Sequence, residues 1–335
     1  MVKLGAFQNF ADLTMSLSLP DLSRTSYRKL RSLKMRYFGE VGYITRQLHR
    51  LEVHVRERAR IAKRRTLMAE RSVSPQAVAI ARDLAENGYH ITTVAALGLD
   101  ESVISSCRDL YTPYDSLDLA GVIAKRQGKG KRYWIDLYEE FGQQRMPVLD
   151  FLLSDIVLDV CGTYLSEVPV LDYITLLLTP PQGGTIADEC RASQDWHLDN
   201  DRAQRVKVFM LPLGADAECG PTMFLPKKFS DPSNYRAFYP GYFTDQQFKQ
   251  SGLDESRIVK FTGEPGAVLF FDTSTLFHCG SRTASKPRLM LCADFGPIST
   301  YLPHRTAART IWPESCLPEI NLEIMRKFGA TRPKI

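Results

Sequence analysis

The spacing of apolar residues changes partway along the chain, close to Pro169. Before this point, apolar residues recur at steps of three and four, which is the period of an amphipathic helix. After it, short runs of β-branched and aliphatic residues are separated by glycine- and proline-rich turns, which predicts strands. Helices followed by many short strands without intervening helices favour an antiparallel sandwich or barrel over a parallel α/β sheet.

The first half carries clear helix boundaries. Ser74-Pro75 is typical of an N-cap followed by proline at the first helical position, and Asn87-Gly88 is typical of a left-handed C-terminal cap. We therefore expect a helix between these two signals and place the start of the main domain at residue 73. The other elements predicted here are a strand over 89–94, a helix over 100–111 and one buried core helix over 147–165.

The second half is read as a series of strands. The turn-forming segments that separate them include Pro180-Pro181-Gln-Gly-Gly and Gly263-Glu-Pro-Gly. The predicted strands cover residues 170–179, 206–213, 222–225, 257–261, 267–271 and 288–295.

Residues 1–72 are predicted to be a basic, helical extension that precedes the domain over 73–335. An amphipathic helix is indicated by an apolar seam at Val41, Ile44, Leu48, Leu51 and Val55. Residues 24–71 hold 15 Lys and Arg against 4 Asp and Glu, a net charge of +11, so the rest of the chain carries −6 of the overall +5. The basic side chains around the seam are Arg46, Arg50, Arg56, Arg60, Lys63, Arg64 and Arg65.

Two interpretations of this extension stay open. In the first, it is a solvated helix that packs by its seam against the main domain or against a second subunit in a homo-oligomer. In the second, its basic face docks on an anionic membrane surface, a polysaccharide or a nucleic acid. Few aromatic residues are present for base stacking, so nucleic acid is the least favoured partner.

Composition and cysteine usage favour a soluble cytoplasmic protein, with peripheral attachment to a membrane as an option through the basic segment. No apolar run of signal-peptide type follows the N-terminus, and no stretch reaches the roughly 18 apolar residues of a membrane span. The seven cysteines are odd in number and form no Cys-x-x-Cys pair. This argues against a zinc ribbon and a disulfide framework, and for reduced thiols.

The candidate chemistry begins at Trp196-His-Leu-Asp199. On an extended strand, His197 and Asp199 point to the same face, where an imidazole and a carboxylate can provide two of the three ligands that non-haem iron favours. His278 is the candidate for the third ligand, at the end of a hydrophobic strand that follows a turn. Arg288 lies on the next predicted strand, and a buried arginine there needs an anionic partner, which a dicarboxylate co-substrate could be.

At this point the sequence resembles the phytanoyl-CoA dioxygenase-like family of Fe(II)/2-oxoglutarate-dependent oxygenases. The resemblance covers roughly residues 74–300, and the order and spacing of its short motifs make it specific. The motifs are Glu86-Asn-Gly-Tyr89, Trp196-His-Leu-Asp199, Cys219-Gly-Pro-Thr-Met-Phe-Leu-Pro226, Gly263-Glu-Pro-Gly-Ala-Val-Leu-Phe-Phe-Asp272 before His278, and Arg288.

The resemblance implies a mainly β (α+β) fold with a double-stranded β-helix core, the jelly-roll or cupin-like arrangement, and helices packed on one side. It implies Fe(II) held by His197, Asp199 and His278, with 2-oxoglutarate chelating the metal and its distal carboxylate on Arg288. The implied reaction uses O2, decarboxylates 2-oxoglutarate to succinate and hydroxylates a C–H bond of a small-molecule, lipid or sugar substrate. The intact carboxylate at Asp199 favours hydroxylation over halogenation.

Three features limit how far the resemblance extends. The family often continues from Leu-Pro into Gly-Ser-His, whereas this chain has Leu225-Pro-Lys-Lys-Phe229, so substrate contacts do not transfer. Phe209 is a candidate aromatic contact for the co-substrate, and Gln194 and Trp196 flank the metal segment. Gln194 and Trp196 could contact the co-substrate or substrate, but each is equally well explained by simple packing, and Ser281 and Arg282 by a solvated loop.

The alternative function is a catalytically inert jelly roll that acts as a binding or scaffold protein, with the basic N-terminal helix as its functional part. Iron-dependent succinate formation, abolished in an Asp199→Ala variant, distinguishes the enzyme from the scaffold.

Overall fold

The computed structural model describes residues 58–119, 134–138, 145–181, 192–199, 204–230, 242–250, 254–280, 282 and 285–297. The apolar seam predicted between Val41 and Val55 lies outside these residues. Within the described residues, no helix is long and apolar enough to cross a membrane.

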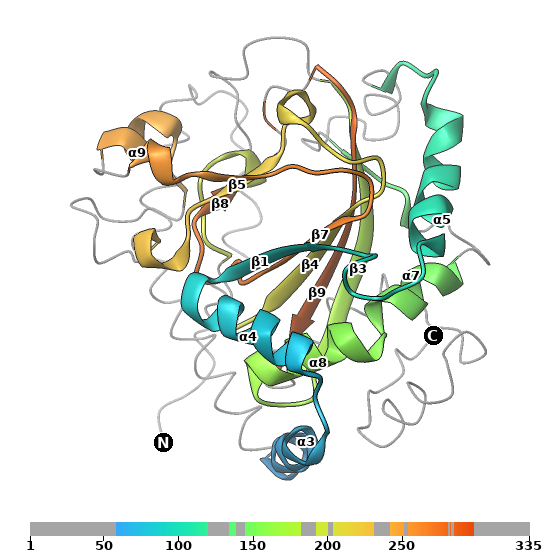
Figure 1. The fold of residues 1–335 in the computed structure, drawn as a ribbon. Coiled ribbons are helices and arrows are strands. Elements are labelled where there is room, and N and C mark those ends of the chain that lie inside the picture. Colours follow the sequence, from blue (N-terminus) through green and yellow to red (C-terminus); the bar gives the residue numbers. More distant parts are fainter. Residues whose placement is uncertain are drawn as a thin grey trace, which may run out of the picture. The chain divides into compact units, whose positions relative to one another are not determined.

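The core is a six-stranded sheet in the order β1-β7-β4-β9-β3-β2, in which every neighbouring pair is antiparallel. Its longest pairing joins β3 to β9, from Thr179 opposite Arg288 to Val170 opposite Gly296. The central strand β4 lies between β7 and β9 (Figure 1), and it carries Phe209 of the predicted site. The strands are β1 (Tyr89–Thr93), β2 (Ile135–Asp136), β3 (Val170–Thr179), β4 (Val206–Leu211), β7 (Ala267–Phe271) and β9 (Arg288–Gly296).

A smaller antiparallel sheet has the order β6-β5-β8, from Val259–Phe261, Thr222–Phe224 and His278–Cys279. Antiparallel bridges from His197 to His278 and from Trp196 to Phe243 continue it beyond β8. The two sheets share an apolar cluster, in which Phe224 and Phe261 of the smaller sheet pack with Phe209, Phe271 and other residues of the larger one. The antiparallel, β-rich core predicted from the sequence is confirmed.

The opposite face of the large sheet is covered by helices, as predicted, and Figure 1 shows them stacked on one side. They are α4 (Pro75–Asn87), α5 (Ser102–Tyr111), α7 (Arg145–Leu152) and α8 (Asp155–Leu165), and α9 (Asp245–Gln250) lies apart from them. Both predicted boundaries of α4 are confirmed. The Ser74 hydroxyl accepts a hydrogen bond from the Ala77 amide, and Gly88 adopts the left-handed conformation with φ of 84°.

The single core helix predicted over 147–165 is wrong, because the structure has two helices, α7 and α8, separated at Leu153-Ser154. Ser154 has an extended backbone with φ of −60° and ψ of 151°, and its hydroxyl donates to the Phe151 carbonyl. Serine at an N-cap followed by aspartate in the first turn is a helix start signal. The apolar periodicity continues across this break, so the pattern alone could not reveal it.

The strand predicted over 267–271 is confirmed as β7, but His278 does not lie at its end as expected. β7 stops at Phe271, and the Asp272 carboxylate then accepts hydrogen bonds from the amide and the hydroxyl of Ser274, 2.8 and 2.5 Å long. The Leu276 amide donates to the Asp272 carbonyl, which closes the turn. His278 therefore belongs to β8 in the smaller sheet and faces the strand end of the larger one from across the core.

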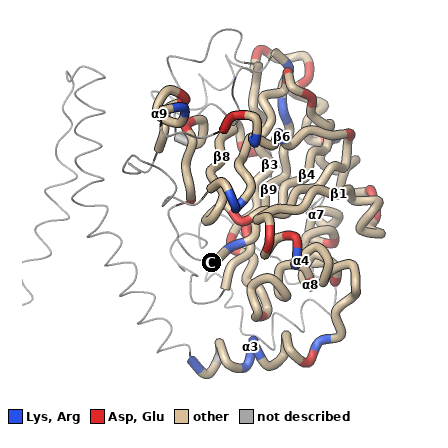
Figure 2. The backbone as a smooth tube through the Cα atoms, turned by 60° about the vertical axis from the view of Figure 1, so that its left-hand side comes forward, with Lys and Arg blue, Asp and Glu red and all other residues tan. Residues whose placement is uncertain are grey.

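Helix α3 (Arg58–Glu70) is rich in basic residues, whose positions along the backbone are blue in Figure 2. Arg58, Lys63 and Arg65 are exposed, whereas Arg64, predicted to lie on a solvated basic face, is buried and donates to the carbonyls of Val168 and Pro169. Burial of Arg64 is possible because these carbonyls, in the loop between α8 and β3, accept hydrogen bonds from its guanidinium. The domain boundary at residue 73 and the docking of residues 24–71 on an anionic surface or a second subunit stay predictions.

We expect Gly88→Ala to lower the free energy of unfolding by about 1–2 kcal/mol or more, because its φ of 84° is unfavourable for a residue with a Cβ. A Cβ at this position would also lie 2.4 Å from Cδ2 of Leu276, so Leu276 would have to move. Gly98→Ala is the matched control, since Gly98 has φ of 70° but nothing within 4 Å of the added Cβ. Chemical denaturation should show a larger loss for Gly88→Ala, and an equal loss would contradict the role of Leu276.

Candidate metal centre

The backbone brings His197, Asp199 and His278 together from two segments that are distant in sequence. The amide of His197 donates to the His278 carbonyl and the amide of His278 donates to the His197 carbonyl, both at 3.0 Å. Two residues later, the Asp199 amide donates to the Thr273 carbonyl at 2.9 Å. These three hydrogen bonds fix both segments relative to each other, so the side chains do not depend on a flexible loop for their placement.

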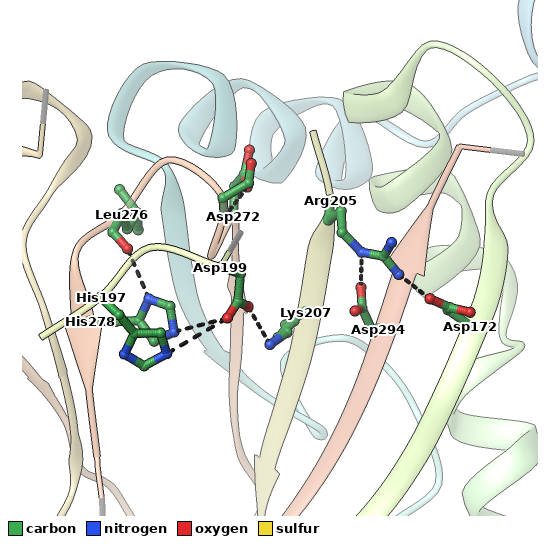
Figure 3. Close-up of polar contacts among 10 residues, drawn as sticks. Asp172, His197, Asp199, Arg205, Lys207, Asp272, Leu276, His278 and Asp294 are labelled. Carbon is green, nitrogen blue, oxygen red and sulfur yellow. Dashed lines mark hydrogen bonds and ion pairs between the residues drawn. The ribbon is translucent and has the colours of Figure 1, made fainter. Parts of the chain in front are cut away.

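The three side chains converge on one point (Figure 3). Oδ1 of Asp199 lies 3.7 Å from Nε2 of His197 and 3.9 Å from Nε2 of His278, and the two imidazole rings have centroids 4.2 Å apart. One ligand atom from each residue lies within 4.8 Å of the others, and both histidines are buried. Two imidazoles and one carboxylate form the donor set of non-haem iron sites with open positions. The residues could therefore hold a metal ion, as the sequence predicted for this set.

Both histidines are oriented in the same way by the backbone. Nδ1 of His197 donates to the Asp195 carbonyl at 2.8 Å, and Nδ1 of His278 donates to the Leu276 carbonyl at 2.9 Å. A carbonyl oxygen can only accept, so each ring carries its proton on Nδ1 and leaves the lone pair on Nε2. Hydrogen bonds of this kind fix the tautomer and the ring orientation of metal-binding histidines.

The ionisation states also suit metal binding. Burial lowers the pKa of His278 to about 3, with a further lowering from His197, and burial is also the main cause of the lowered pKa of His197. Burial opposes ionisation of Asp199, but the Lys207 ammonium lowers its pKa well below the usual range. At neutral pH the site therefore presents two neutral imidazoles and a carboxylate, which are the protonation states that metal ligands require.

Lys207 holds the second oxygen of the carboxylate. Its Nζ lies 2.5 Å from Oδ2 of Asp199, on the side away from the histidines (Figure 3). Burial alone would lower the pKa of Lys207, but Asp199 raises it, so the ammonium stays charged. The sequence analysis did not single out this residue. The available signal was a lone lysine inside the apolar run Val206-Lys-Val-Phe-Met-Leu211.

Arg288 lies where β9 begins and is 3% exposed, as expected for a buried arginine. Its Nη1 donates to the Gly220 carbonyl at 2.8 Å and to the Thr222 hydroxyl at 3.3 Å. The same atom lies 3.7 Å from the position that a Cβ would take on Gly280, two residues after His278. The guanidinium is therefore close to the strand that carries the second histidine.

Gln194 and Phe209 occupy different surroundings. Gln194 is 2% exposed in the turn Ala192–Gln194, and its carbonyl accepts a hydrogen bond of 2.5 Å from Nε of Arg282. Phe209 points to the same side of β4 as Lys207 and packs edge-on against Phe271, which in turn meets the ring of His278 at 89°. Phe209 is thus one ring removed from the ligand histidine.

A second set of residues packs against the segment that carries His197 and Asp199. Trp196 packs away from His197, stacks on Phe248 with centroids 4.1 Å apart, and donates through Nε1 to Asp245 at 2.9 Å. Arg282, equally well explained from the sequence as a solvated loop residue, has a side chain that is 10% exposed and also pairs with Asp245. Tyr242 stacks on the His197 ring with centroids 5.3 Å apart. No sequence signal connected residues 242–250 with the triad, because these contacts are distant in sequence, with 49 positions between Trp196 and Asp245.

No family model matches the chain, and no curated protein matches it. Among solved structures, it is similar to EvdO2 from Micromonospora carbonacea var. aurantiaca, with 17% identity over 67% of this chain and 91% of that one, and a TM-score of 0.45. It is also similar to EctD from S. alaskensis with 2-oxoglutarate and 5-hydroxyectoine, with 15% identity over 68% of this chain and 77% of that one, and a TM-score of 0.44. A third similar structure is the epimerase SnoN in complex with Fe3+, alpha-ketoglutarate and nogalamycin RO, with 12% identity over 66% of this chain and 83% of that one, and a TM-score of 0.43.

EvdO2 has also been solved with 2-oxoglutarate, and EctD with bound iron. With TM-scores below 0.5, the likeness carries no conclusion about the activity of this chain, and the function rests on its own residues.

Proposed function

We propose that this chain is an Fe(II)- and 2-oxoglutarate-dependent dioxygenase that hydroxylates a C–H bond of a small-molecule, lipid or sugar substrate. The observation that carries the proposal is the arrangement of His197, Asp199 and His278. Two neutral Nε2 atoms and one carboxylate oxygen converge, and backbone hydrogen bonds already hold both rings in the orientation that a metal requires.

We assign the distal carboxylate of 2-oxoglutarate to Arg288. Its Nη1 bonds Thr222 on β5, and two positions further along that strand Phe224 lies opposite His278. Two residues of a strand span about 7 Å, a distance that a five-carbon dicarboxylate can bridge. A buried guanidinium at that distance offers a fork of donors for a carboxylate.

The chain's own residues have separable tasks in this reaction. His197, Asp199 and His278 would hold the iron, which when bound supplies oxidative chemistry with O2 and 2-oxoglutarate. Arg288 would orient the co-substrate by its far end. The apolar residues between the sheets, among them Phe209, Phe271 and Met290, exclude water from the reaction space.

The fold that supports these tasks is, in our proposal, a double-stranded β-helix. The two antiparallel sheets pack face to face, helices cover one side, and both histidines lie on the smaller sheet and its continuation. The inert scaffold alternative is not favoured, because a scaffold has no need of two histidines with fixed tautomers and a carboxylate directed at the same point.

The experiment that tests the proposal is anaerobic titration of the purified protein with Fe(II) and then with 2-oxoglutarate, followed by calorimetry. We expect stoichiometric metal binding and 2-oxoglutarate binding that requires the metal. Succinate formation in air follows as the second readout. A protein that binds neither iron nor 2-oxoglutarate would exclude the proposed function.

Arg288→Lys is expected to weaken 2-oxoglutarate binding by roughly 10- to 100-fold while leaving iron binding unchanged. Hydrogen bonds to charged groups contribute about 1.5–3 kcal/mol, and lysine cannot reproduce the two-donor fork. Lys260→Met, on an exposed position of β6, removes a cation from the same small sheet and is the control. Unchanged 2-oxoglutarate affinity in Arg288→Lys would remove Arg288 from the co-substrate site.

A further inference from the structure

Asp199 presents its two oxygens to different partners. Oδ1 faces Nε2 of both histidines, at 3.7 and 3.9 Å, whereas Oδ2 receives the Lys207 ammonium at 2.5 Å. Figure 3 shows the carboxylate between the imidazole pair and the lysine. The two carboxylate oxygens therefore have different partners. Oδ1 is directed at the candidate metal position, and Oδ2 contacts the Lys207 ammonium.

The backbone of Lys207 cannot shift easily. It is on the central strand β4, paired with Phe271 on β7 and with Asp294 on β9. Its side chain is 14% exposed and points to the face of β4 that also carries Phe209 and Leu211. A lysine on an edge strand or a loop could move away from the carboxylate, whereas this one is held on both sides by sheet hydrogen bonds.

Asp294, the other acidic residue next to Lys207, is already engaged. Nε of Arg205 donates to Oδ1 of Asp294 at 2.8 Å, and both side chains are 4% exposed. Arg205 also bonds Asp172 at 2.5 Å. Because Arg205 satisfies Asp294, the Lys207 ammonium is directed to Asp199.

We propose that Lys207 is a positioning residue that restricts Asp199 to coordinating the metal through Oδ1 alone. The inference rests on the proposed function, since it assumes a metal at the triad. A carboxylate can bind a metal through one oxygen or through both. A second Asp199 oxygen on the metal would occupy one of the open positions that the co-substrates need, and the Lys207 ammonium prevents this by holding Oδ2.

The two effects of Lys207 on ligand binding have opposite signs, and this separates the proposal from a purely structural role. The ammonium repels a dication, so removing it leaves metal affinity equal or increased. Removing it also frees Oδ2 to bind the metal, which competes with chelation by 2-oxoglutarate. A lysine that only stabilised the fold would, when replaced, weaken both.

The test uses Co(II) as a spectroscopic probe in the full-length protein. The visible absorption of Co(II) reports its coordination number, and the Co(II)-loaded protein does not consume 2-oxoglutarate during the measurement. Wild type, Lys207→Met, Lys207→Arg and the control Lys286→Met are compared. Lys286 pairs with Asp216 and Glu218, is about half exposed, and matches the loss of one lysine ion pair outside the site. The readouts are the Co(II) spectrum, the Co(II) dissociation constant and the 2-oxoglutarate dissociation constant of the Co(II)-loaded protein.

We expect Lys207→Met to bind Co(II) at least as tightly as wild type, with a spectrum of higher coordination number and 2-oxoglutarate affinity lower by roughly 10- to 100-fold. Lys207→Arg keeps the charge and the donor, so it should restore the wild-type spectrum, and Lys286→Met should not differ from wild type. Thermal unfolding of each variant with Co(II) bound establishes that it is folded. If Lys207→Met does not fold, Lys207→Gln, which keeps a donor without the charge, replaces it.

Two results would overturn the inference alone. These are a Lys207→Met spectrum identical to that of wild type, and parallel losses of metal and 2-oxoglutarate affinity. A wild-type protein that binds neither Co(II) nor Fe(II) would instead overturn the proposed function and this inference with it. The two failures are thus distinguished by the wild-type titration.

Discussion

Asp199→Ala is expected to reduce iron-dependent conversion of 2-oxoglutarate to succinate to the background rate. The substitution removes the carboxylate from the donor set, and two imidazoles alone lack the negative charge that offsets the dication. The same change leaves the Lys207 ammonium, 14% exposed, without the carboxylate that it contacts. Removing one partner of a buried pair costs about 3–5 kcal/mol, so the variant is also expected to be less stable.

A second substitution separates the two effects. In Asp199→Ala/Lys207→Met, both charges are gone, and an apolar side chain fills the space next to Phe209. We expect most of the lost unfolding free energy to return, because replacing both members of a buried pair is far less costly than removing one. Succinate formation should stay at background, since no carboxylate ligand is restored.

The measurements are denaturant unfolding of the metal-free proteins and succinate production with Fe(II). Glu255→Ala is the control, because Glu255 is an exposed carboxylate that pairs with Lys249, and neither property should change. Iron-dependent turnover in Asp199→Ala would show that the triad assignment is wrong. A double variant as unstable as Asp199→Ala would show that the ion pair with Lys207 is not the cause of the instability.

Much of the fold follows from local signals in the sequence. The boundaries of α4 could be predicted because Ser74, Pro75 and Gly88 each have a backbone role that does not depend on tertiary contacts. The break between α7 and α8 could not, since the apolar period continues across Ser154 and both helices pack on the same core. The short strand β8 was missed because it consists of only His278 and Cys279, too few residues to show an alternating pattern.

In the candidate site, too, some residues could be predicted from local sequence signals and others could not. His197 and Asp199 could be recognised from a spacing of two, and His278 from its position after a turn. Lys207 could not be placed, because β4 is buried on both faces and alternation therefore gives no direction. Val206, Val208 and Met210 pack with the helices, whereas Phe209 and Leu211 pack between the sheets. Only the structure shows that Lys207 shares the second face, next to Asp199.

Arg205→Met is expected to lower the free energy of unfolding by about 3–5 kcal/mol, the other large effect in this molecule. Arg205 is 3% exposed and contacts two carboxylates, Asp294 at 2.8 Å and Asp172 at 2.5 Å. Methionine fills a similar volume but leaves Asp294, itself 3% exposed, without that guanidinium. Denaturant unfolding of the metal-free protein at neutral pH measures the loss.

The large expected effect of Arg205 on the free energy of unfolding comes from the burial of its ion pairs and not from their number. Lys286 also contacts two carboxylates, Asp216 and Glu218, but at the surface, where water solvates each charge after the pair is broken. Lys286→Met should therefore leave stability unchanged within error. Arg205→Met/Asp294→Leu should recover part of the loss, because it removes the deeply buried carboxylate as well, while Asp172, 16% exposed, can be solvated. An equal effect of Arg205→Met and Lys286→Met would contradict this explanation. It would also show that Asp294 can be accommodated in the core without the Arg205 guanidinium.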